Sequence, residues 1–367
     1  MNEHEHDHAR LLLAIVRGDW AEAEALAGPG PVAASFCDCC LESDVAAWVH
    51  ARVTAGGRGE LLGPPVMQRL QRIRARVRHD NLLLLARARQ ALACLVDAGV
   101  APVALKGLDL IHRVHGSFDE RTLDDVDLLI EPARLGAALD ALQAQGWQPP
   151  PEPRRTHYIR SSHHLPLSSP GPVPVEFEIH WNLAQELRYR IDERALRERA
   201  RPLEIDGLSV LRLEDHDLVA HLLLHHFTHY FDRRLKWAID IGAVAQRPGF
   251  EWEVVLDRVR GWGATAAVSM ALVHLHKMVP AWIPERVVRS LPVGGWRRAL
   301  VRPLRSAHPL ELFRRTRRRW VQLYLAAVLL EQPLLLPRWL ARRLSRDRRR
   351  GSNPIEGLPR SGGRDEL

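Results

Sequence analysis

Residues 105–130 read LKGLDLIHRVHGSFDERTLDDVDLLI and carry the strongest indication of fold in this chain of 367 residues. The segment ends in DVDLLI, which is typical of a short buried strand. Asp125 and Asp127 are two residues apart, so in a strand both side chains point to one face while their apolar neighbours point to the core. Two carboxylates on one face repel each other unless a cation lies between them. The pair therefore predicts a site for a hard divalent ion, Mg²⁺ or Mn²⁺.

A second strand offers further acidic side chains. Residues 174–181, PVEFEIHW, alternate strictly, which places Glu176, Glu178 and His180 on one face. The aspartate pair alone would indicate a solvated strand edge, but a third carboxylate from a neighbouring strand would complete a cluster able to hold two metal ions. Two-metal sites of this kind catalyse in-line phosphoryl or nucleotidyl transfer. Glu176 and Glu178 are both candidates for the third ligand.

Upstream of the aspartate pair, Lys106 and Gly107 follow a short apolar stretch, residues 100–105, that is predicted to be a strand. Glycine lets the backbone approach a phosphate closely, and amides that open a helix favour an anion. We therefore expect a phosphate-binding turn at this point. Arg121 either contacts the phosphates or pairs with Asp124, which is expected to be a solvated or capping residue before the strand.

Taken in order, these motifs resemble the uncharacterised nucleotidyltransferase family of the DNA polymerase β-like superfamily. The family pattern is a Leu-Lys-Gly turn, then Arg-x-x-x-Asp-hydrophobic-Asp-Leu-Leu, then an acidic-x-His-Trp strand. It also includes an Asn-hydrophobic-hydrophobic helix end before the turn, and later a histidine and a basic-Leu-x-Trp-x-x-Asp run. The matching segments are 105–107, 121–129, 178–181, 80–83 and 234–240, with the histidine at His225.

The resemblance implies an α+β fold, in which a small mixed polymerase β-like nucleotidyltransferase sheet core is flanked by N- and C-terminal helical regions. It also implies roles for particular residues. The catalytic metal ligands would be Asp125, Asp127 and Glu178, the nucleotide phosphates would be bound by Lys106, Gly107 and Arg121, and His180, His225 and Trp237 would orient a ligand or line the acceptor pocket. The chain departs from the superfamily at Leu108, because Gly-Ser is usual in the phosphate turn and its phosphate-binding hydroxyl is missing here.

The expected function is Mg²⁺-dependent transfer of a nucleoside monophosphate from a nucleoside triphosphate (NTP) to an acceptor hydroxyl on a small molecule, a peptide or a protein. One alternative is a non-catalytic nucleotide-binding module, which Leu108 favours. The other is a helical adaptor whose basic C-terminus docks on a membrane or on nucleic acid. His225 and His229 share a helix face and could bind zinc, but packing beside the cleft is the favoured interpretation. Asp240 is expected to pair with an arginine.

Four regions are expected along the chain: an N-terminal helical region (1–99), the nucleotidyltransferase core (100–205), a C-terminal helical region (206–340) and a basic, flexible tail (341–367). Helices are predicted at residues 9–27, 66–97, 218–231, 235–246, 251–278 and 320–330. Further strands are predicted at residues 156–161 and 164–167. Gly99 is expected to end the helix before the core.

The net charge of +8 is unevenly distributed. Residues 301–350 hold 14 arginines and three acidic residues, a net charge of +11, which leaves −3 for the rest of the chain. This basic segment could be a solvated helix face, a peripheral contact with anionic membrane, or a surface for an acidic or nucleic-acid partner, but sequence-specific nucleic-acid binding is not expected. Four cysteines and no signal-like or spanning apolar segment indicate a cytoplasmic protein.

Overall fold

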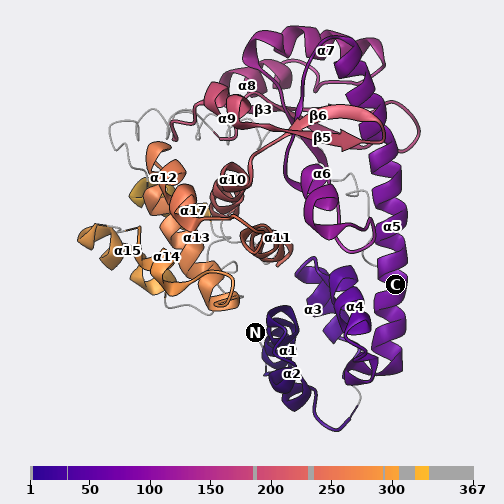
Figure 1. Ribbon diagram of the computed structural model, residues 1–367, viewed down its shortest axis with the longest axis vertical. Coiled ribbons are helices and arrows are strands. Elements are labelled where there is room, and N and C mark those ends of the chain that lie inside the picture. The colour runs from indigo at the N-terminus through magenta and orange to yellow at the C-terminus, as the bar shows by residue number, and fades with distance from the viewer. Residues whose placement is uncertain are drawn as a thin grey trace.

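The computed structural model describes residues 3–30, 32–184, 188–229, 235–291, 294–305 and 319–329. Helix α5 (Gly59–Asp97) runs along one side of the molecule and connects its N-terminal helices to a sheet at the far end (Figure 1). The helix is bent at Gly63, where φ is 75°, and Pro64 and Pro65 then restart it. Beyond the bend, buried side chains recur every three or four residues, so one stripe faces the rest of the protein. The stripe comprises Val66, Leu70, Ile73, Val77, Asn81, Leu84, Ala88, Leu92 and Leu95.

Four helices precede α5 and pack beside its first half (Figure 1): α1 (Glu3–Arg17), α2 (Trp20–Ala27), α3 (Phe36–Glu42) and α4 (Ala46–Ala55). The helix predicted at residues 9–27 is in fact two helices. The chain turns at Gly18, whose φ is +72°. The side chain of Asp19 then caps α2 by accepting a hydrogen bond from the amide of Glu22 at 3.1 Å.

The sheet has six strands in the order β3-β4-β2-β1-β6-β5. Its members are β1 (Val103–Ala104), β2 (Val126–Leu129), β3 (His164–Ser168), β4 (Glu176–His180), β5 (Arg201–Ile205) and β6 (Leu208–Arg212). β2 and β4 are parallel, as are β1 and β6, whereas the other neighbours are antiparallel. The sheet is therefore mixed, and the predicted α+β class is confirmed. The hairpin β5–β6 extends past residue 205, so the boundary expected there falls inside the sheet.

Short helices connect these strands: α6 (Lys106–Leu110), the π-helical turn η1 (Ile111–His115), the 3₁₀ turn η2 (Pro132–Arg134), α7 (Leu135–Ala144), α8 (Arg154–Ser161) and α9 (Glu193–Arg199). The prediction of a strand at residues 156–161 is wrong, because that segment forms α8. The carboxylate of Glu152 accepts hydrogen bonds from the amide of Thr156 at 3.2 Å and from its hydroxyl at 2.7 Å, which stabilises the first helical turn.

The C-terminal helices are α10 (Asp215–Thr228), α11 (Lys236–Ala245), α12 (Trp252–Gly261), α13 (Thr265–Met278), α14 (Glu285–Arg289), α15 (Gly295–Arg305) and α17 (Arg319–Val328). The single helical region predicted at 251–278 divides at Gly263, whose φ is +65°. The expected tail at 341–367 and most of the arginine-rich segment lie outside the described residues.

Two hydrophobic cores hold these layers together. One lies between a face of the sheet, the second half of α5 and α7. The other joins the N-terminal helices, the first half of α5 and the C-terminal helices. A hydrogen bond from Arg17 Nε to the carbonyl of Met278 (2.7 Å) links α1 to α13. The two flanking helical regions, which are far apart in the sequence, therefore pack as one body.

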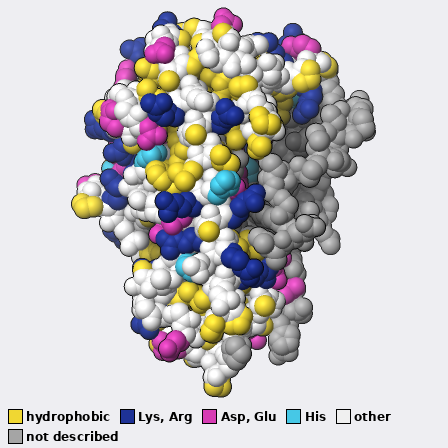
Figure 2. All heavy atoms as spheres, turned by 90° about the vertical axis from the view of Figure 1, so that its right-hand side faces the viewer, with side chains coloured by type: hydrophobic (Ala, Val, Ile, Leu, Met, Phe, Trp, Pro, Cys, Tyr) yellow, Lys and Arg dark blue, Asp and Glu magenta, His cyan; other side chains and the backbone are white. Residues whose placement is uncertain are grey.

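The outer face of α5 is the part of the surface that Figure 2 presents. Basic and apolar side chains are interspersed there. Two apolar side chains of α5, Leu82 and Leu83, are exposed. Across the parts of the chain that the structure describes, no helix has both the length and the apolar character needed to cross a bilayer.

Candidate functional site

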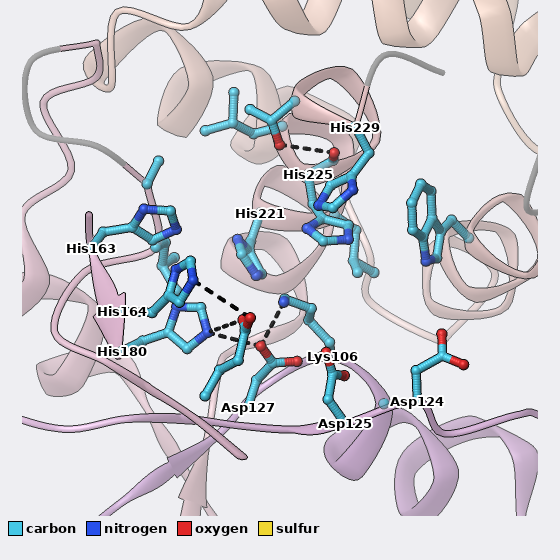
Figure 3. A pocket seen from close by; sticks show the side chains of 18 of the residues that line it. Lys106, Asp124, Asp125, Asp127, His163, His164, His180, His221, His225 and His229 are labelled. Atoms are coloured by element: carbon cyan, nitrogen blue, oxygen red, sulfur yellow. Dashed lines mark hydrogen bonds and ion pairs between the residues drawn. The ribbon is translucent and has the colours of Figure 1, made fainter. Parts of the chain in front are cut away.

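The two predicted acidic strands are direct neighbours. β2 and β4 pair in parallel with Asp127 opposite Glu178, and Asp125 lies one residue before β2. All three carboxylates line a cavity of about 410 Å³ between the sheet and helix α10 (Figure 3). Glu176, the alternative third ligand, is exposed and does not line this cavity. The expected neighbourhood of the strands is thus confirmed, while the ligand roles of the carboxylates stay predictions.

Asp127 is the most strongly held of the three carboxylates. Its Oδ1 accepts hydrogen bonds from Lys106 Nζ at 2.6 Å and from His180 Nε2 at 2.8 Å, and its side chain is only 2% exposed. Burial raises the pKa of Asp127, but Lys106 and His180 outweigh it and hold the pKa well below its ordinary value. Lys106 has a φ of +44°, which a non-glycine residue rarely adopts. The backbone is thus strained where it brings the ammonium group to Asp127.

His180 lies between two carboxylates, because its Nε2 is also 3.2 Å from Glu178 Oε2. Burial lowers the pKa of His180, yet the hydrogen bonds to Asp127 and Glu178 raise it above its ordinary value overall. The same hydrogen bond from His180 lowers the pKa of Glu178 against the effect of burial. The imidazole therefore bridges the neighbouring carboxylates, as expected of a residue that orients Glu178.

Asp125 has the opposite electrostatic behaviour. Burial and the nearby Asp127 raise its pKa from 3.8 to about 7. The cluster therefore contains more carboxylate than Lys106 and His180 can neutralise. An oxygen-rich site with an excess of negative charge suits a hard dication, and Asp127, Glu178 and His180 have ligand atoms within 4.8 Å of one another. Two of the three predicted ligands, Asp127 and Glu178, thus fit a divalent ion, while Asp125 lines the cavity outside this group.

Gly107 and Arg121 meet behind the acidic cluster. A Cβ atom at Gly107 would lie 2.7 Å from Arg121 Nη1 and 2.7 Å from Leu123 Cδ2, so a larger residue would force these side chains to shift. Arg121 pairs with Asp240 and not with Asp124: its Nε and Nη2 lie 3.0 and 2.9 Å from the carboxylate oxygens. Both side chains are buried. The prediction that Asp240 pairs with an arginine is confirmed, and the phosphate contacts of Gly107 and Arg121 stay predictions.

Asn81 on α5 positions the loop that carries Arg121. Its side-chain amide donates to the carbonyls of Phe118 (2.9 Å) and Arg121 (2.7 Å), and its oxygen accepts from the amide of Leu123 (3.0 Å). These three bonds fix the segment that leads into β2. They give a physical reason for an asparagine in the helix before the turn.

Helix α10 supplies the opposite wall of the cavity, where His221, His225 and His229 project toward the acidic cluster (Figure 3). The ring of His225 lies 4.8 Å from that of Trp237 and 4.2 Å from that of His229. Burial and the charge of Lys106 lower the pKa of His221 to about 3, so this imidazole is neutral at physiological pH. His225 and Trp237 do line the cavity, and their contact with an acceptor stays a prediction. Among the described residues, no metal-ligand group includes His225 and His229.

Several residues at the cavity were not predicted from the sequence. His163, His164 and His221 line it, and so does Lys236, whose Nζ lies 3.1 Å from Asp124 and 2.6 Å from Asp44. The helical register of His221 with His225 was a usable signal, because side chains four residues apart share a face. His163 and His164 gave no such signal, since their place depends on the pairing of β3 with β4.

Residues 33–280 match the family described as uncharacterised nucleotidyltransferase. No curated protein matches the chain. Among solved structures, the antibiotic-resistance factor ANT(2'')-Ia has a TM-score of 0.31 and 13% identity, with 62% of this chain and 100% of that chain covered. An antigenic nucleotidyltransferase-like protein from Paracoccidioides brasiliensis has a TM-score of 0.35 and 15% identity, with 57% and 91% covered.

Proposed function

The chain belongs to the uncharacterised nucleotidyltransferase family, and we propose that it moves a nucleoside monophosphate from an NTP onto an acceptor hydroxyl, with release of pyrophosphate. One observation carries this proposal. Asp125, Asp127 and Glu178 face the same cavity from neighbouring strands, and the ammonium group of Lys106 lies among them. Carboxylates and a cation arranged in this way suit two-metal in-line transfer.

In the proposed site, Asp125, Asp127 and Glu178 would hold Mg²⁺, or Mn²⁺ in its place. When bound, such ions neutralise the triphosphate and lower the pKa of the acceptor hydroxyl. The acceptor oxygen attacks the α-phosphorus and the bond from that phosphorus to the pyrophosphate oxygen breaks. The hydroxyl proton passes to Glu178 or to water.

The chain's own residues orient the reacting groups. Lys106 supplies positive charge beside the phosphates. His180 contacts the carboxylates of Asp127 and Glu178 and fixes their positions relative to each other. Arg121 supports the phosphate turn indirectly, because its guanidinium pairs with Asp240 and packs against Gly107. The acceptor would lie between the sheet and the wall formed by His225 and Trp237.

The phosphate turn itself favours a second candidate, a nucleotide-binding module without catalysis. Leu108 is fully buried in the core, so the turn offers no hydroxyl to a phosphate. However, Lys106, Arg188 and Lys236 all line the cavity, so positive charge for a triphosphate is present without that hydroxyl. The third candidate, a docking adaptor, depends on the arginine-rich segment, most of which lies outside the described residues.

The test is transfer of label from each NTP, in turn, into products in a cell extract that contains Mg²⁺. The double substitution Asp125→Asn with Asp127→Asn should abolish labelling while the circular dichroism spectrum stays unchanged. Glu176→Gln is the matched control, since it removes one charge from the same sheet outside the cavity, and it should label normally. Undiminished labelling by the double variant would refute the site. Mg²⁺-dependent nucleotide binding with no transfer to any product would favour the binding module.

A further inference from the structure

Three histidines form a second cluster at the edge of the cavity. One ring nitrogen from each of His163, His164 and His180 lies within 4.8 Å of the corresponding nitrogens of the other two. Their ring centroids are 4.8 to 5.5 Å apart. Figure 3 shows the three rings one above another on the side of the cavity away from Asp124 and Asp125. The cluster therefore adjoins the predicted magnesium ligands, which it contacts through Nε2 of His180.

The fold brings the three rings together in a way that regular strands would not. Neighbouring residues of a strand point to opposite faces, but His163 lies in the bend that precedes β3 while His164 begins the strand. The bend brings both rings to one side. His164 is then placed directly opposite His180 by the antiparallel pairing of β3 with β4.

His163 and His180 each have a ring nitrogen without a hydrogen bond, whereas Nδ1 of His164 lies 3.4 Å from the hydroxyl of Ser162. Nε2 of His180 is held by Asp127 at 2.8 Å, while its Nδ1 is buried without a hydrogen-bond partner. Nδ1 of His163 is also buried without a partner. Buried polar atoms are rarely left without one. A histidine that binds a metal through one ring nitrogen usually donates the other to a carboxylate, which is how His180 meets Asp127.

We propose that His163, His164 and His180 bind a borderline transition-metal dication of the Zn²⁺ and Co²⁺ type, with water completing its coordination. Oε1 of Glu178 is 3.5 Å from His164 Nε2, so a carboxylate oxygen is already beside the imidazoles. Imidazole nitrogens suit Zn²⁺ and Co²⁺, whereas Mg²⁺ takes oxygen ligands. Nδ1 of His180 is available to such an ion, because its Nε2 is engaged by Asp127.

The geometry requires only a small contraction. Nitrogen ligands of a tetrahedral ion are about 2.0–2.1 Å from the metal and hence roughly 3.4 Å from each other. Side-chain rotations that move each nitrogen by about 1 Å close the present cluster to that spacing. The proposal goes beyond nucleotidyl transfer and does not depend on it: the Asp125 and Asp127 end of the cavity would take a hard ion, and the histidine end a softer one.

Cobalt binding tests the proposal, because tetrahedral Co²⁺ with histidine ligands absorbs strongly in the visible region. The full chain is used with His4, His6 and His8 replaced by asparagine, since these N-terminal histidines could bind Co²⁺ themselves. After treatment with a chelator, one equivalent of Co²⁺ should give a tetrahedral spectrum that Zn²⁺ abolishes and excess Mg²⁺ does not. His163→Ala and His164→Ala should each weaken Co²⁺ binding at least tenfold, whereas His79→Ala, an exposed histidine on α5, should not.

The outcomes separate this inference from the proposed function. A weak octahedral spectrum, displacement by Mg²⁺, or an unchanged spectrum in a folded His163→Ala or His164→Ala variant would overturn it. Asp125→Asn should keep the cobalt spectrum. If labelled nucleotide is transferred but no tetrahedral cobalt forms, only the histidine site is wrong. If cobalt binds as expected and no nucleotide is transferred, only the transfer reaction is wrong.

Discussion

Replacing Asp240 by asparagine tests the ion pair that supports the phosphate turn. Asp240 is fully buried on α11 and accepts hydrogen bonds from two nitrogens of Arg121 at 2.9 to 3.1 Å. Nε2 of His115 lies 2.9 Å from the same carboxylate. The guanidinium of Arg121 is itself only 5% exposed. The substitution keeps the shape of the side chain but removes the negative charge that a buried cation needs.

The expected loss can be worked from the pKa of Asp240. Burial raises this pKa, but Arg121 outweighs it and lowers the value from 3.8 to about 2. At about 1.36 kcal/mol per unit, the charged form contributes roughly 2 kcal/mol to the free energy of unfolding. Breaking a buried ion pair by removing one partner costs about 3–5 kcal/mol, because the other charge stays buried. We therefore expect Asp240→Asn to lower the free energy of unfolding by roughly 2–5 kcal/mol.

Urea unfolding at pH 7, followed by tryptophan fluorescence, measures this loss. Glu198→Gln is the control: it removes the same charge from an exposed pair, in which Arg194 is 89% and Glu198 62% exposed. The control should change stability by less than about 1 kcal/mol. Because the folded pKa of Asp240 is depressed, its contribution is complete above pH 4 or so and is lost as pH falls toward 2. If Asp240→Asn were as stable as the control, the ion pair would not support the turn.

Three further predictions concern the surroundings of the cluster. Asn81→Ala removes three hydrogen bonds to the loop before β2. It should lower the free energy of unfolding by about 1–3 kcal/mol in the same urea assay. Asp80→Asn, on the exposed side of α5, should leave this free energy unchanged. Gly107→Ala places a Cβ 2.7 Å from Arg121 Nη1 and should lower the free energy of unfolding by about 1–3 kcal/mol. The control Gly136→Ala, whose Cβ would have nothing within 4 Å, should leave stability unchanged or raise it. Equal melting temperatures of the two variants would exclude the predicted clash. The pKa of Asp125 is raised from 3.8 to about 7, so in a chelator the melting temperature should fall as pH rises through that window; Asp125→Asn should lack this fall, and Mg²⁺ should reduce it in the wild type.

The acidic end of the site was predictable because its signal is local. Alternation within a strand places Asp125 and Asp127 on one face of the first strand. It likewise places Glu178 and His180 on one face of the second strand. Buried strands of this kind can also be recognised in the sequence as short runs of apolar residues. The step that needed the structure was the pairing of β2 with β4, which places Asp127 beside Glu178.

The parts that sequence reasoning missed depend on contacts between distant segments. The hairpin β5–β6 has few buried side chains, so it lacks a clear alternating pattern. Helix α8 carries Thr156, Tyr158 and Ile159, which favour strands, yet the bond from Glu152 starts a helix there. His163, His164 and His221 line the cavity only because β3 and α10 pack beside the acidic strands, which the sequence does not show. The pairing of Arg121 with Asp240 was not predicted either, because nothing near Arg121 in the sequence identifies a partner 119 residues away.

The two cores that share helix α5 limit how the length of this chain can change. Val77 faces the core that joins the N- and C-terminal helices, and Leu84 faces the core between α5 and the sheet. Asn81 lies between them on α5. Each added or deleted residue in a helix turns everything beyond it by about 100°. One such change between Val77 and Leu84 would take either set of apolar side chains off its core and Asn81 off its loop. Relatives of this chain should therefore gain and lose residues in their connecting loops, and keep this segment constant in length.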